Sequence, residues 1–247
     1  QMFVNWNRWC KTNNKYIPKD RTATEDHLRV GDGFAKRHAL RQTVNNPSYI
    51  NSKAPDHKLI EAKKVVKQCM SEGRKVVIFC AYEAQAQKYA DAFANLNPAL
   101  YTGDTSALGD VKDVNSKAMK FRKGESEDDH HAWVLDSSGR PVPDPDGQTM
   151  SALDYERITF QNIADRKLLI ATYSAGSVGS TFTAGNAMIL DDLPADCVEA
   201  IQAEGRIRRI DPNRLTHAVK KYYTLESHYP PSFMDKVSKR WLVKQEH

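Results

Sequence analysis

The sequence predicts an α/β protein in which helices cover a mostly parallel sheet. Residues 75–81, which are apolar after Lys75, and residues 168–171 are short apolar runs, which are typical of strands buried on both faces of a parallel sheet. Amphipathic helical patterns alternate with strand patterns along the chain, and this alternation is typical of βαβ units. At 247 residues, the chain is long enough to bury one large core or two small ones.

The first half of the chain reads as helix, strand, helix and strand. Asp56 is a candidate N-cap, because its carboxylate is able to accept hydrogen bonds from the free amides at a helix start. Gly73 marks the end of that helix, and the strand over 75–81 follows. A second amphipathic helix is predicted over 83–96 and a short strand over 98–102.

Residues 107–150 break this alternation, and we interpret them as an inserted loop and hairpin. They hold an acidic run at 125–129 and a hairpin pattern that turns at Ser137 to Gly139. Asp128, Asp129, His130 and His131 have the residue types of metal ligands. However, no apolar strand leads into them, and neighbouring loop residues rarely aim at one ion. We therefore interpret this cluster as a solvated loop and predict no metal site.

The second half of the chain returns to the α/β pattern. The apolar run that starts at Leu168 ends at Thr172, and a turn of small residues with Gly176 and Gly179 follows. The other predicted elements are a helix over 154–165, strands over 187–190 and 218–225, a helix that carries Gln202, and a final helix that begins at Ser232.

Three polar side chains share one face of the helix that follows the strand over 187–190. Gln202, Arg206 and Arg209 are spaced by four and three residues, which places them on one side at 3.6 residues per turn. The rigid fork of an arginine matches phosphate oxygens, so this face suits a polyanion. A solvated basic face is the alternative. The preceding strand favours a site, because ligands of open α/β sheets bind at the carboxyl ends of strands.

Composition narrows the function classes only moderately. Lys and Arg total 36 against 31 Asp and Glu, and the net charge of +5 permits nucleic-acid binding without demanding it. The four cysteines are far apart and form no C-x-x-C pair, so we expect reduced thiols rather than disulfides or a zinc site. No apolar run approaches the roughly 18 residues of a membrane span. We expect an intracellular protein, cytoplasmic if prokaryotic or viral and nuclear if eukaryotic, without membrane contact.

Several motifs resemble those of the superfamily-two helicases. Residues 202–209, QAEGRIRR, resemble motif VI, and residues 171–184 resemble motif V. The residues of these two motifs are most similar to those of the SWI/SNF-type DNA translocases, which carry runs similar to AGGVGLNLTAA and QAxDRxxRIGQ. Phe79 to Tyr82 stands where that family has FSxF, Gly103 to Ser106 where it has GxTS, and residues 40–47, LRQTVNNP, resemble the LRQICNHP segment before the second lobe. The resemblance implies a RecA-like three-layer α/β/α fold and the second, C-terminal motor lobe.

The resemblance also implies a divided nucleotide site. The sequence has no G-x-x-x-x-G-K-[ST] loop, and it begins at Gln, so we expect a piece of a longer protein. ATP and Mg²⁺ would be held mainly by a first RecA-like lobe absent from this chain. Arg206 and Arg209 would be the catalytic arginines, with Gln202 and Gly179 also in the nucleotide site. By itself this chain is expected to be inactive.

The remaining motif residues are expected to contact nucleic acid. Strand ends and turns expose backbone amides that suit phosphates, and such contacts position a duplex without reading its bases. The candidates for this role are Tyr82, Thr105, Thr172, Ser174 and Gly176. The expected partners are the first lobe of the same protein and double-stranded DNA, or RNA.

Two alternatives to a DNA translocase lobe remain open. One is an RNA helicase lobe, and the other is a non-catalytic module that binds nucleic acid or protein. Leu193-Pro194-Ala195 stands in place of Trp-Asn-Pro, Gly205 in place of Asp, and Asp211-Pro212 in place of Gly-Gln. These departures leave open the choice between duplex translocation and strand separation. The predicted division is a lead-in segment over 1–50, the lobe over 51–226 and a C-terminal helix over 227–247.

Overall fold

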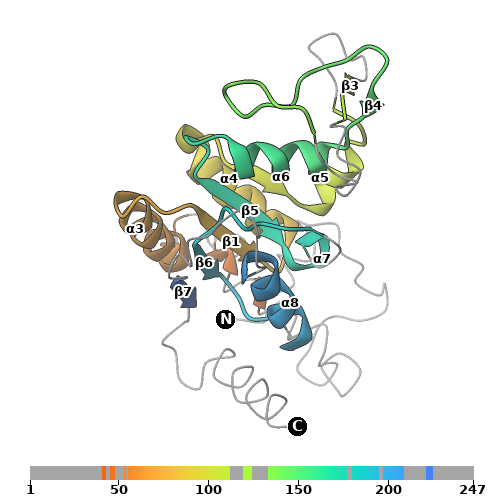
Figure 1. Cartoon of the computed structure of the whole chain (residues 1–247). Coiled ribbons are helices and arrows are strands. Elements are labelled where there is room, and N and C mark those ends of the chain that lie inside the picture. Colours follow the sequence, from red (N-terminus) through yellow and green to blue (C-terminus); the bar gives the residue numbers. More distant parts are fainter. Residues whose placement is uncertain are drawn as a thin grey trace, which may run out of the picture.

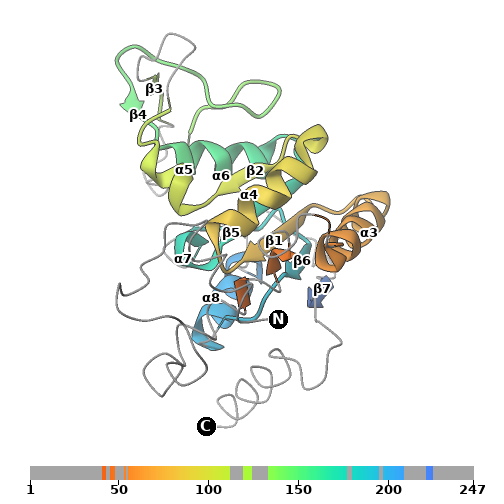
Figure 2. The ribbon, with the colours of Figure 1, turned by 180° about the vertical axis from the view of Figure 1, so that it is seen from behind.

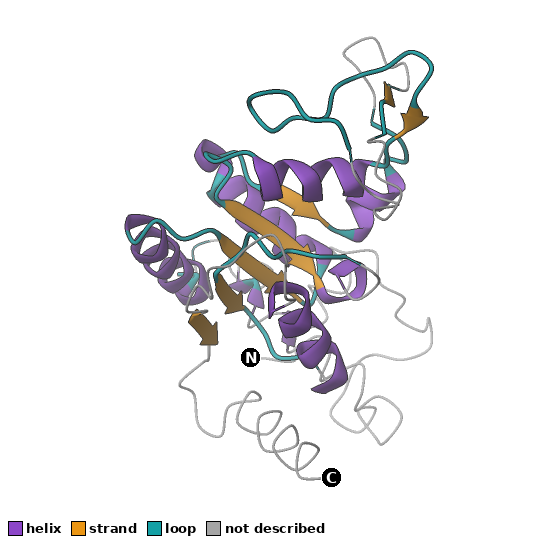
Figure 3. Cartoon of the chain, viewed as in Figure 1, coloured by secondary structure: helices purple, strands orange, loops and turns teal. Residues whose placement is uncertain are grey.

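A parallel sheet forms the centre of the computed structural model (Figure 1). The structure describes residues 41–42, 45–47, 53, 55–111, 119–123, 133–176, 180–194, 197–208 and 221–224. The described elements, in chain order, are α3 (His57–Ser71), β1 (Val76–Cys80), α4 (Glu83–Ala92), η3 (Ala94–Leu96), β2 (Ala99–Tyr101), α5 (Gly103–Ala107), β3 (Lys120–Phe121), β4 (Gln148–Thr149), α6 (Ala152–Asn162), β5 (Leu168–Thr172), α7 (Tyr173–Gly176), β6 (Ala187–Leu190), α8 (Cys197–Arg208) and β7 (Lys221–Thr224). Figure 3 shows the strands enclosed by helices.

The sheet has five strands in the order β2-β5-β1-β6-β7, and every neighbouring pair is parallel. β1 is central, with Cys80 opposite Thr172 of β5 and Phe79 opposite Leu190 of β6. Every residue of β1 and β5 is buried, because helices cover both faces of these strands. The predicted parallel α/β fold is therefore confirmed, and the last predicted strand is present as β7.

Helices cover the sheet in two layers. Alternate residues of a strand point to opposite faces, so Ile78 and its neighbours pack with α3 and α4 in one core cluster. Phe79 and its neighbours pack in the other cluster with Phe160 of α6 and with residues of α7 and α8. α8 lies in front of the sheet in Figure 1, and α4 lies in front of it in Figure 2. The arrangement is the predicted three-layer α/β/α sandwich.

The helix ends follow the predicted signals in most places. Asp56 caps α3, because its Oδ1 accepts a hydrogen bond of 2.9 Å from the Leu59 amide. Gly73 follows that helix with a φ of 72°, as a C-terminal glycine does. The helix predicted over 83–96 is shorter, because α4 ends at Ala92 and a separate 3₁₀ turn leads to Asn97 in the left-handed conformation. Gly103 to Ser106, the counterpart of the GxTS motif, belongs to the short helix α5.

Lys75 stabilises the carboxyl end of α6. Its Nζ donates hydrogen bonds to the carbonyl oxygens of Phe160 (2.5 Å) and Ile163 (2.8 Å). A cation at this end satisfies carbonyls that have no partner within the helix and interacts favourably with the helix dipole. Lys75→Met is expected to lower the free energy of unfolding by about 1–2 kcal/mol in urea denaturation. Lys64→Met is the control, because Lys64 is exposed in an ion pair with Glu61; an equal loss there would contradict the assignment.

The insertion carries a small core of its own above α6 (Figure 1). β3 and β4 pair antiparallel, and Phe121, Met150 and Ile158 are buried together. The predicted hairpin is present, with a bridge between Leu135 and Pro141 and a turn at residues 137–138. The acidic run at 125–129 and the two histidines lie outside the described residues. Within the described part of the chain, no three His, Cys, Asp or Glu side chains gather as a metal site would require.

Two further sequence expectations concern the thiols and the membrane. Cys69 and Cys80 are buried free thiols. Among the helices that the structure describes, none has both the length and the apolar character that crossing a membrane requires. The final helix from Ser232, the segment 1–40 and the domain boundaries at 50 and 227 fall outside the described residues or remain predictions.

Candidate functional site at the carboxyl edge of the sheet

The parallel strands bring the predicted nucleic-acid residues to one edge of the sheet. Tyr82 follows β1, Thr105 follows β2, and Thr172 ends β5. Cys80 is opposite Thr172, and Tyr101 is opposite Ala171, so these strand ends lie side by side. Ser174 and Gly176 belong to α7, which begins directly after β5. This shared edge is where open α/β sheets bind ligands.

These residues differ in how much of them solvent reaches. Ser174 is exposed and Tyr82 is half-buried, whereas Thr105, Thr172 and Gly176 are buried. The Ser174 hydroxyl donates to Thr172 Oγ1 at 3.3 Å. Thr105 lies in the first turn of α5, where its amide donates to the capping Thr102 hydroxyl at 3.2 Å. Side-chain contact with a large ligand is therefore open to Ser174 and Tyr82, and the buried threonines support the turns around them.

Gly176 is required by close packing against the sheet. A Cβ at this position would lie 3.0 Å from Cε1 of Phe79, whose ring also stacks with Tyr173 at a centroid distance of 5.6 Å. A contact this short is tighter than ordinary side-chain packing, so a larger residue would require the Phe79 ring or α7 to shift. The role that the structure gives Gly176 is thus the placement of α7 under the strand ends.

Gln202 and Arg206 lie one turn apart on α8, which packs through Ala203 and Ile207. Gln202 is exposed and Arg206 is half-buried. Arg206 Nη1 donates to the Ser180 carbonyl at 3.3 Å, and the Phe182 amide donates to the Arg206 carbonyl at 2.8 Å. Gly179 and Arg209 lie outside the described residues, so the structure places two of the four predicted nucleotide-binding residues.

A short chain of contacts links Arg206 to the carboxyl edge. The Ser180 hydroxyl forms a hydrogen bond with the phenol of Tyr101, the last residue of β2. Arg206, held on the Ser180 carbonyl, therefore lies near the same strand ends as Ser174. A guanidinium held in this way on a packed helix suits the binding of phosphate groups.

A buried polar network lies at the same edge, and the sequence reasoning gave it no role. Asp191 and Asp192 follow β6 directly and are 0% and 1% exposed. The Tyr89 hydroxyl donates to Asp191 Oδ1, and Lys58 Nζ donates to the Asp191 carbonyl and to Asn45 Oδ1. The network could have been predicted from the two adjacent aspartates at the end of a buried strand, because buried carboxylates require partners.

Burial sets the protonation of this network. Desolvation raises the pKa of the Asp191 carboxyl above its usual range, while the nearby Lys58 ammonium acts in the opposite direction. Burial also raises the pKa of the Tyr89 phenol and of the Cys80 thiol, and Asp191 adds to both shifts. The Cys80 thiol is therefore kept neutral and unreactive at this site.

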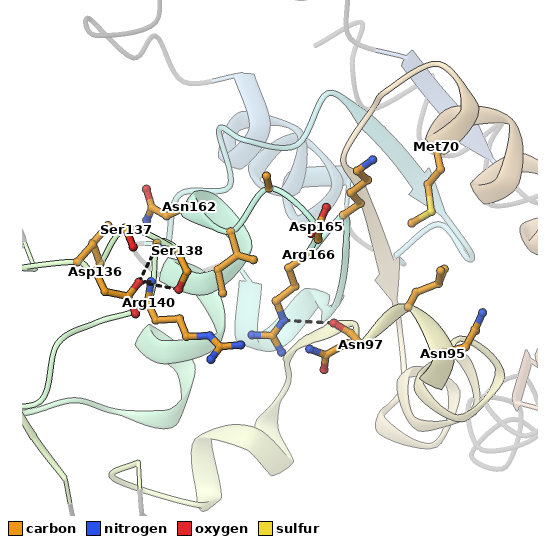
Figure 4. A pocket seen from close by; sticks show the side chains of 16 residues that line it. Met70, Asn95, Asn97, Asp136, Ser137, Ser138, Arg140, Asn162, Asp165 and Arg166 are labelled. Carbon is orange, nitrogen blue, oxygen red and sulfur yellow. Dashed lines mark hydrogen bonds between the residues drawn. The ribbon is translucent and has the colours of Figure 1, made fainter.

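A cleft of about 990 Å³ lies at the opposite, amino-terminal edge of the sheet (Figure 4). Its walls are the hairpin tip at 136–140, the connection at 162–167 and the segment 95–97. Arg166 lines this cleft, but its guanidinium already interacts with neighbouring residues. It donates to the Asn97 carbonyl and pairs with Glu156 at 2.6 Å. No predicted site residue lines the cleft, so it is separate from the carboxyl edge.

Comparisons with known proteins identify the fold. No protein-family model matches the sequence, and no curated protein matches it. The C-terminal domain of a Sulfolobus solfataricus SWI2/SNF2 ATPase matches with a TM-score of 0.50 at 14% identity, covering 100% of this chain and 80% of that one. The core domain of a Sulfolobus solfataricus SWI2/SNF2 ATPase matches with a TM-score of 0.53 at 15% identity, covering 98% and 39%.

The C-terminal part of the Fun30 ATPase domain matches with a TM-score of 0.48 at 14% identity, covering 96% of this chain and 65% of that one. This chain therefore spans less than two thirds of the Fun30 fragment and of the Sulfolobus core domain. The two Sulfolobus matches support the overall α/β fold described above. The chain has the RecA-like α/β fold of the C-terminal domain of a SWI2/SNF2 ATPase.

Proposed function

We propose that this chain is the second motor lobe of an ATP-dependent DNA translocase or helicase. Arg206 and Arg209 would meet the phosphates of ATP, and the strand ends would meet the DNA backbone. The observation that carries the proposal is the position of Arg206, which is held on α8 beside the carboxyl edge of a sheet with the SWI2/SNF2 C-terminal fold. A rigid guanidinium at that place suits the charge that develops during phosphoryl transfer.

ATP and Mg²⁺ are assigned to a first lobe. The sequence lacks a glycine-rich loop with a Gly-Lys pair, and the described residues offer no group of carboxylates that would hold the ion. Mg²⁺ would neutralise charge on the phosphates when it is bound there. This chain's share is to orient Gln202, Gly179, Arg206 and Arg209 and to exclude water when the two lobes close.

DNA is proposed to bind through its backbone, without sequence preference. Ser174 is exposed after β5, and Tyr82 is half-buried after the neighbouring strand β1. A hydroxyl and a phenol of this kind position a phosphate, whereas base readout requires side chains that reach into a groove. Thr105, Thr172 and Gly176 support the backbone on which these contacts depend.

The test is ATP hydrolysis by the intact protein, with both lobes, in the presence of duplex DNA, single-stranded DNA or duplex RNA. Duplex DNA is expected to stimulate hydrolysis most, and the 247-residue chain alone is expected to hydrolyse no ATP. Stronger stimulation by RNA would favour an RNA helicase lobe. An intact protein that neither binds nor hydrolyses ATP would favour a non-catalytic binding module.

Ser174→Glu is expected to raise the DNA concentration needed for half-maximal stimulation by roughly tenfold. The substitution places a negative charge where a phosphate is proposed to lie, and Ser174 is exposed, so the fold tolerates it. Ser137→Glu is the matched control, because Ser137 is equally exposed but lies at the hairpin tip. The same loss in both variants would point to general charge repulsion and contradict a contact at Ser174.

A further inference from the structure

Hydrogen bonds join Arg41 and Asn45, which precede the lobe, to Asp192 and Leu193, which precede α8. Arg41 and Gln42, which belong to the LRQTVNNP segment at 40–47, are helical, and so is Asn45. Arg41 donates through Nε to Asp192 Oδ2 and through Nη2 to the Leu193 carbonyl. Asn45 Nδ2 donates to the same Asp192 oxygen at 2.8 Å. Residues some 150 positions apart in the sequence thus share one carboxylate.

Asp192 is the meeting point of three segments at the carboxyl edge. Its carboxylate accepts from Arg41 and Asn45, and its carbonyl accepts from the Tyr173 hydroxyl at 2.8 Å. Tyr173 begins α7, and only residues 193–196 separate Asp192 from the start of α8 at Cys197. Both the carboxylate and the backbone of this residue are therefore held in place, a few positions before the helix that carries Gln202 and Arg206.

Arg41 also reaches the neighbouring strand end. Its guanidinium carbon lies 5.8 Å from the centre of the Tyr82 ring, a distance at which a cation interacts with the ring face. Burial favours the neutral guanidine, but Asp192 outweighs this effect and raises the pKa of Arg41. The side chain thus stays charged and holds the connections after β1 and after β6 together.

Stability alone does not account for such a pair. The Arg41 and Asp192 side chains are 11% and 1% exposed, and removing two charges from water costs much of what their attraction provides. Apolar side chains of similar volume often stabilise a buried site as well or better. An apolar pair does not fix the orientation of its two partners. The planar fork of Arg41 does, because it binds an Asp192 oxygen and the Leu193 carbonyl at the same time.

We propose that Arg41 and Asp192 form a positioning pair that sets the placement of α8, and with it Gln202 and Arg206, relative to the strand ends. The inference rests on the proposed function, because it explains how the guanidinium of Arg206 is aimed. It adds that the segment before the lobe is a working part of the nucleotide site. Movement of that segment would be transmitted through Asp192 to α8.

The chain contains a matched control for this pair. Arg166 and Glu156 form a second, partly buried ion pair, with side chains 10% and 19% exposed, and Arg166 also donates to the carbonyls of Asn97 and Pro98. These partners lie beside the starts of β2 and β5, at the opposite edge of the sheet (Figure 4). Arg166→Met therefore removes a comparable interaction without touching α8.

The first measurement is steady-state ATP hydrolysis by the intact protein with saturating duplex DNA, below the unfolding temperature of each variant. Arg41→Met is expected to lower kcat at least tenfold and to change KM for ATP less than threefold, because binding is assigned mainly to the other lobe. Arg166→Met is expected to keep kcat within twofold at a similar loss of thermal stability. An unchanged kcat in Arg41→Met, or equal losses in both variants, would overturn the proposal.

A second variant covers the case in which Arg41→Met does not fold. The double variant Arg41→Met, Asp192→Leu replaces the pair by apolar side chains and is expected to recover stability. Its kcat is expected to stay at least tenfold low, because the fork is still missing. Recovery of kcat together with stability would show that any well-packed pair suffices, and the positioning role would be wrong.

Hydrogen exchange separates this inference from the proposed function, since it needs no turnover. In the intact protein, amides of α8 are expected to exchange at least tenfold faster in Arg41→Met than in the wild type, and at an unchanged rate in Arg166→Met. If the wild type hydrolyses no ATP, the motor assignment fails and the exchange rates still decide the positioning of α8. Unchanged exchange in α8 would overturn the positioning pair even where ATP is hydrolysed.

Discussion

Replacing Arg206 by alanine in the intact two-lobe protein is expected to lower kcat for ATP hydrolysis by about 10³-fold or more while ATP still binds. Negative charge spreads over the phosphoryl oxygens as the bond to the leaving group breaks, and a guanidinium held in place stabilises that charge at no cost of reorganisation. Arg206 has this fixed position because α8 is packed and its Nη1 is bonded to the Ser180 carbonyl. The same loss is expected for Arg209→Ala.

The measurement pairs steady-state hydrolysis with direct binding of a non-hydrolysable ATP analogue. Arg157→Ala is the control, because Arg157 is a half-buried arginine on α6 that pairs with Asp154 of the same helix. It is expected to keep kcat within about twofold, since a surface ion pair contributes little. Turnover that is unchanged in Arg206→Ala and Arg209→Ala would remove both residues from the catalytic role.

Lys58→Met is expected to lower the free energy of unfolding by about 3–5 kcal/mol near neutral pH. Lys58 is 7% exposed, and among the described cations its ammonium does most to lower the pKa of the fully buried Asp191. It also bonds the Asp191 carbonyl and Asn45 Oδ1 at 2.7 Å. Without it, Asp191 keeps a buried charge with less compensation, and two acceptors lose their donor.

The loss in Lys58→Met is expected to depend on pH in a defined direction. The folded pKa of Asp191 is raised by burial, so its protonation stabilises the fold below the unfolded pKa, and that stabilisation is lost as pH rises through the folded value. Removal of Lys58 raises the folded pKa further, because Lys58 is the first group that lowers it. The deficit of the variant is therefore smallest in acid and grows as Asp191 ionises.

Urea denaturation across the acidic to neutral range checks this. Lys67→Met on the same helix is the control, because Lys67 is exposed. Its effect is expected to stay within about 0.5 kcal/mol at every pH. A deficit in Lys58→Met that is equally large in acid and at neutral pH would assign the effect to lost hydrogen bonds and packing rather than to the charge of Asp191.

The parallel sheet was predictable from sequence because its pattern is local. The residues of β1 and the first four of β5 are apolar without interruption, which is typical of a strand covered on both faces. The bounds of β6 coincide with the predicted run at 187–190. The cap at Asp56 was likewise readable, since a carboxylate three residues before a free amide acts within one turn.

Features that depend on distant partners were not predictable in the same way. Asp192 finds Arg41 and Asn45 only after the sheet has formed, so neither residue carried a signal by itself. A polar residue type also did not predict whether a side chain at the site is exposed to solvent. Thr105 and Thr172 are buried because nearby hydroxyls and turns satisfy them, whereas Ser174, of similar chemistry, faces solvent.

The central position of β1 has a consequence for the kinetics of folding. The first described strand must wait for partners far along the chain, since Val76 pairs with Leu168 and with Ala187. Such non-local pairing slows folding, because a long loop has to close, at a cost in entropy, before any stabilising contact forms. The insertion lengthens the loop that precedes β5, yet each doubling of a loop costs only about 0.6 kcal/mol, or roughly threefold in rate. Evolution is thus free to add or trim sequence at this position with little effect on how fast the sheet assembles.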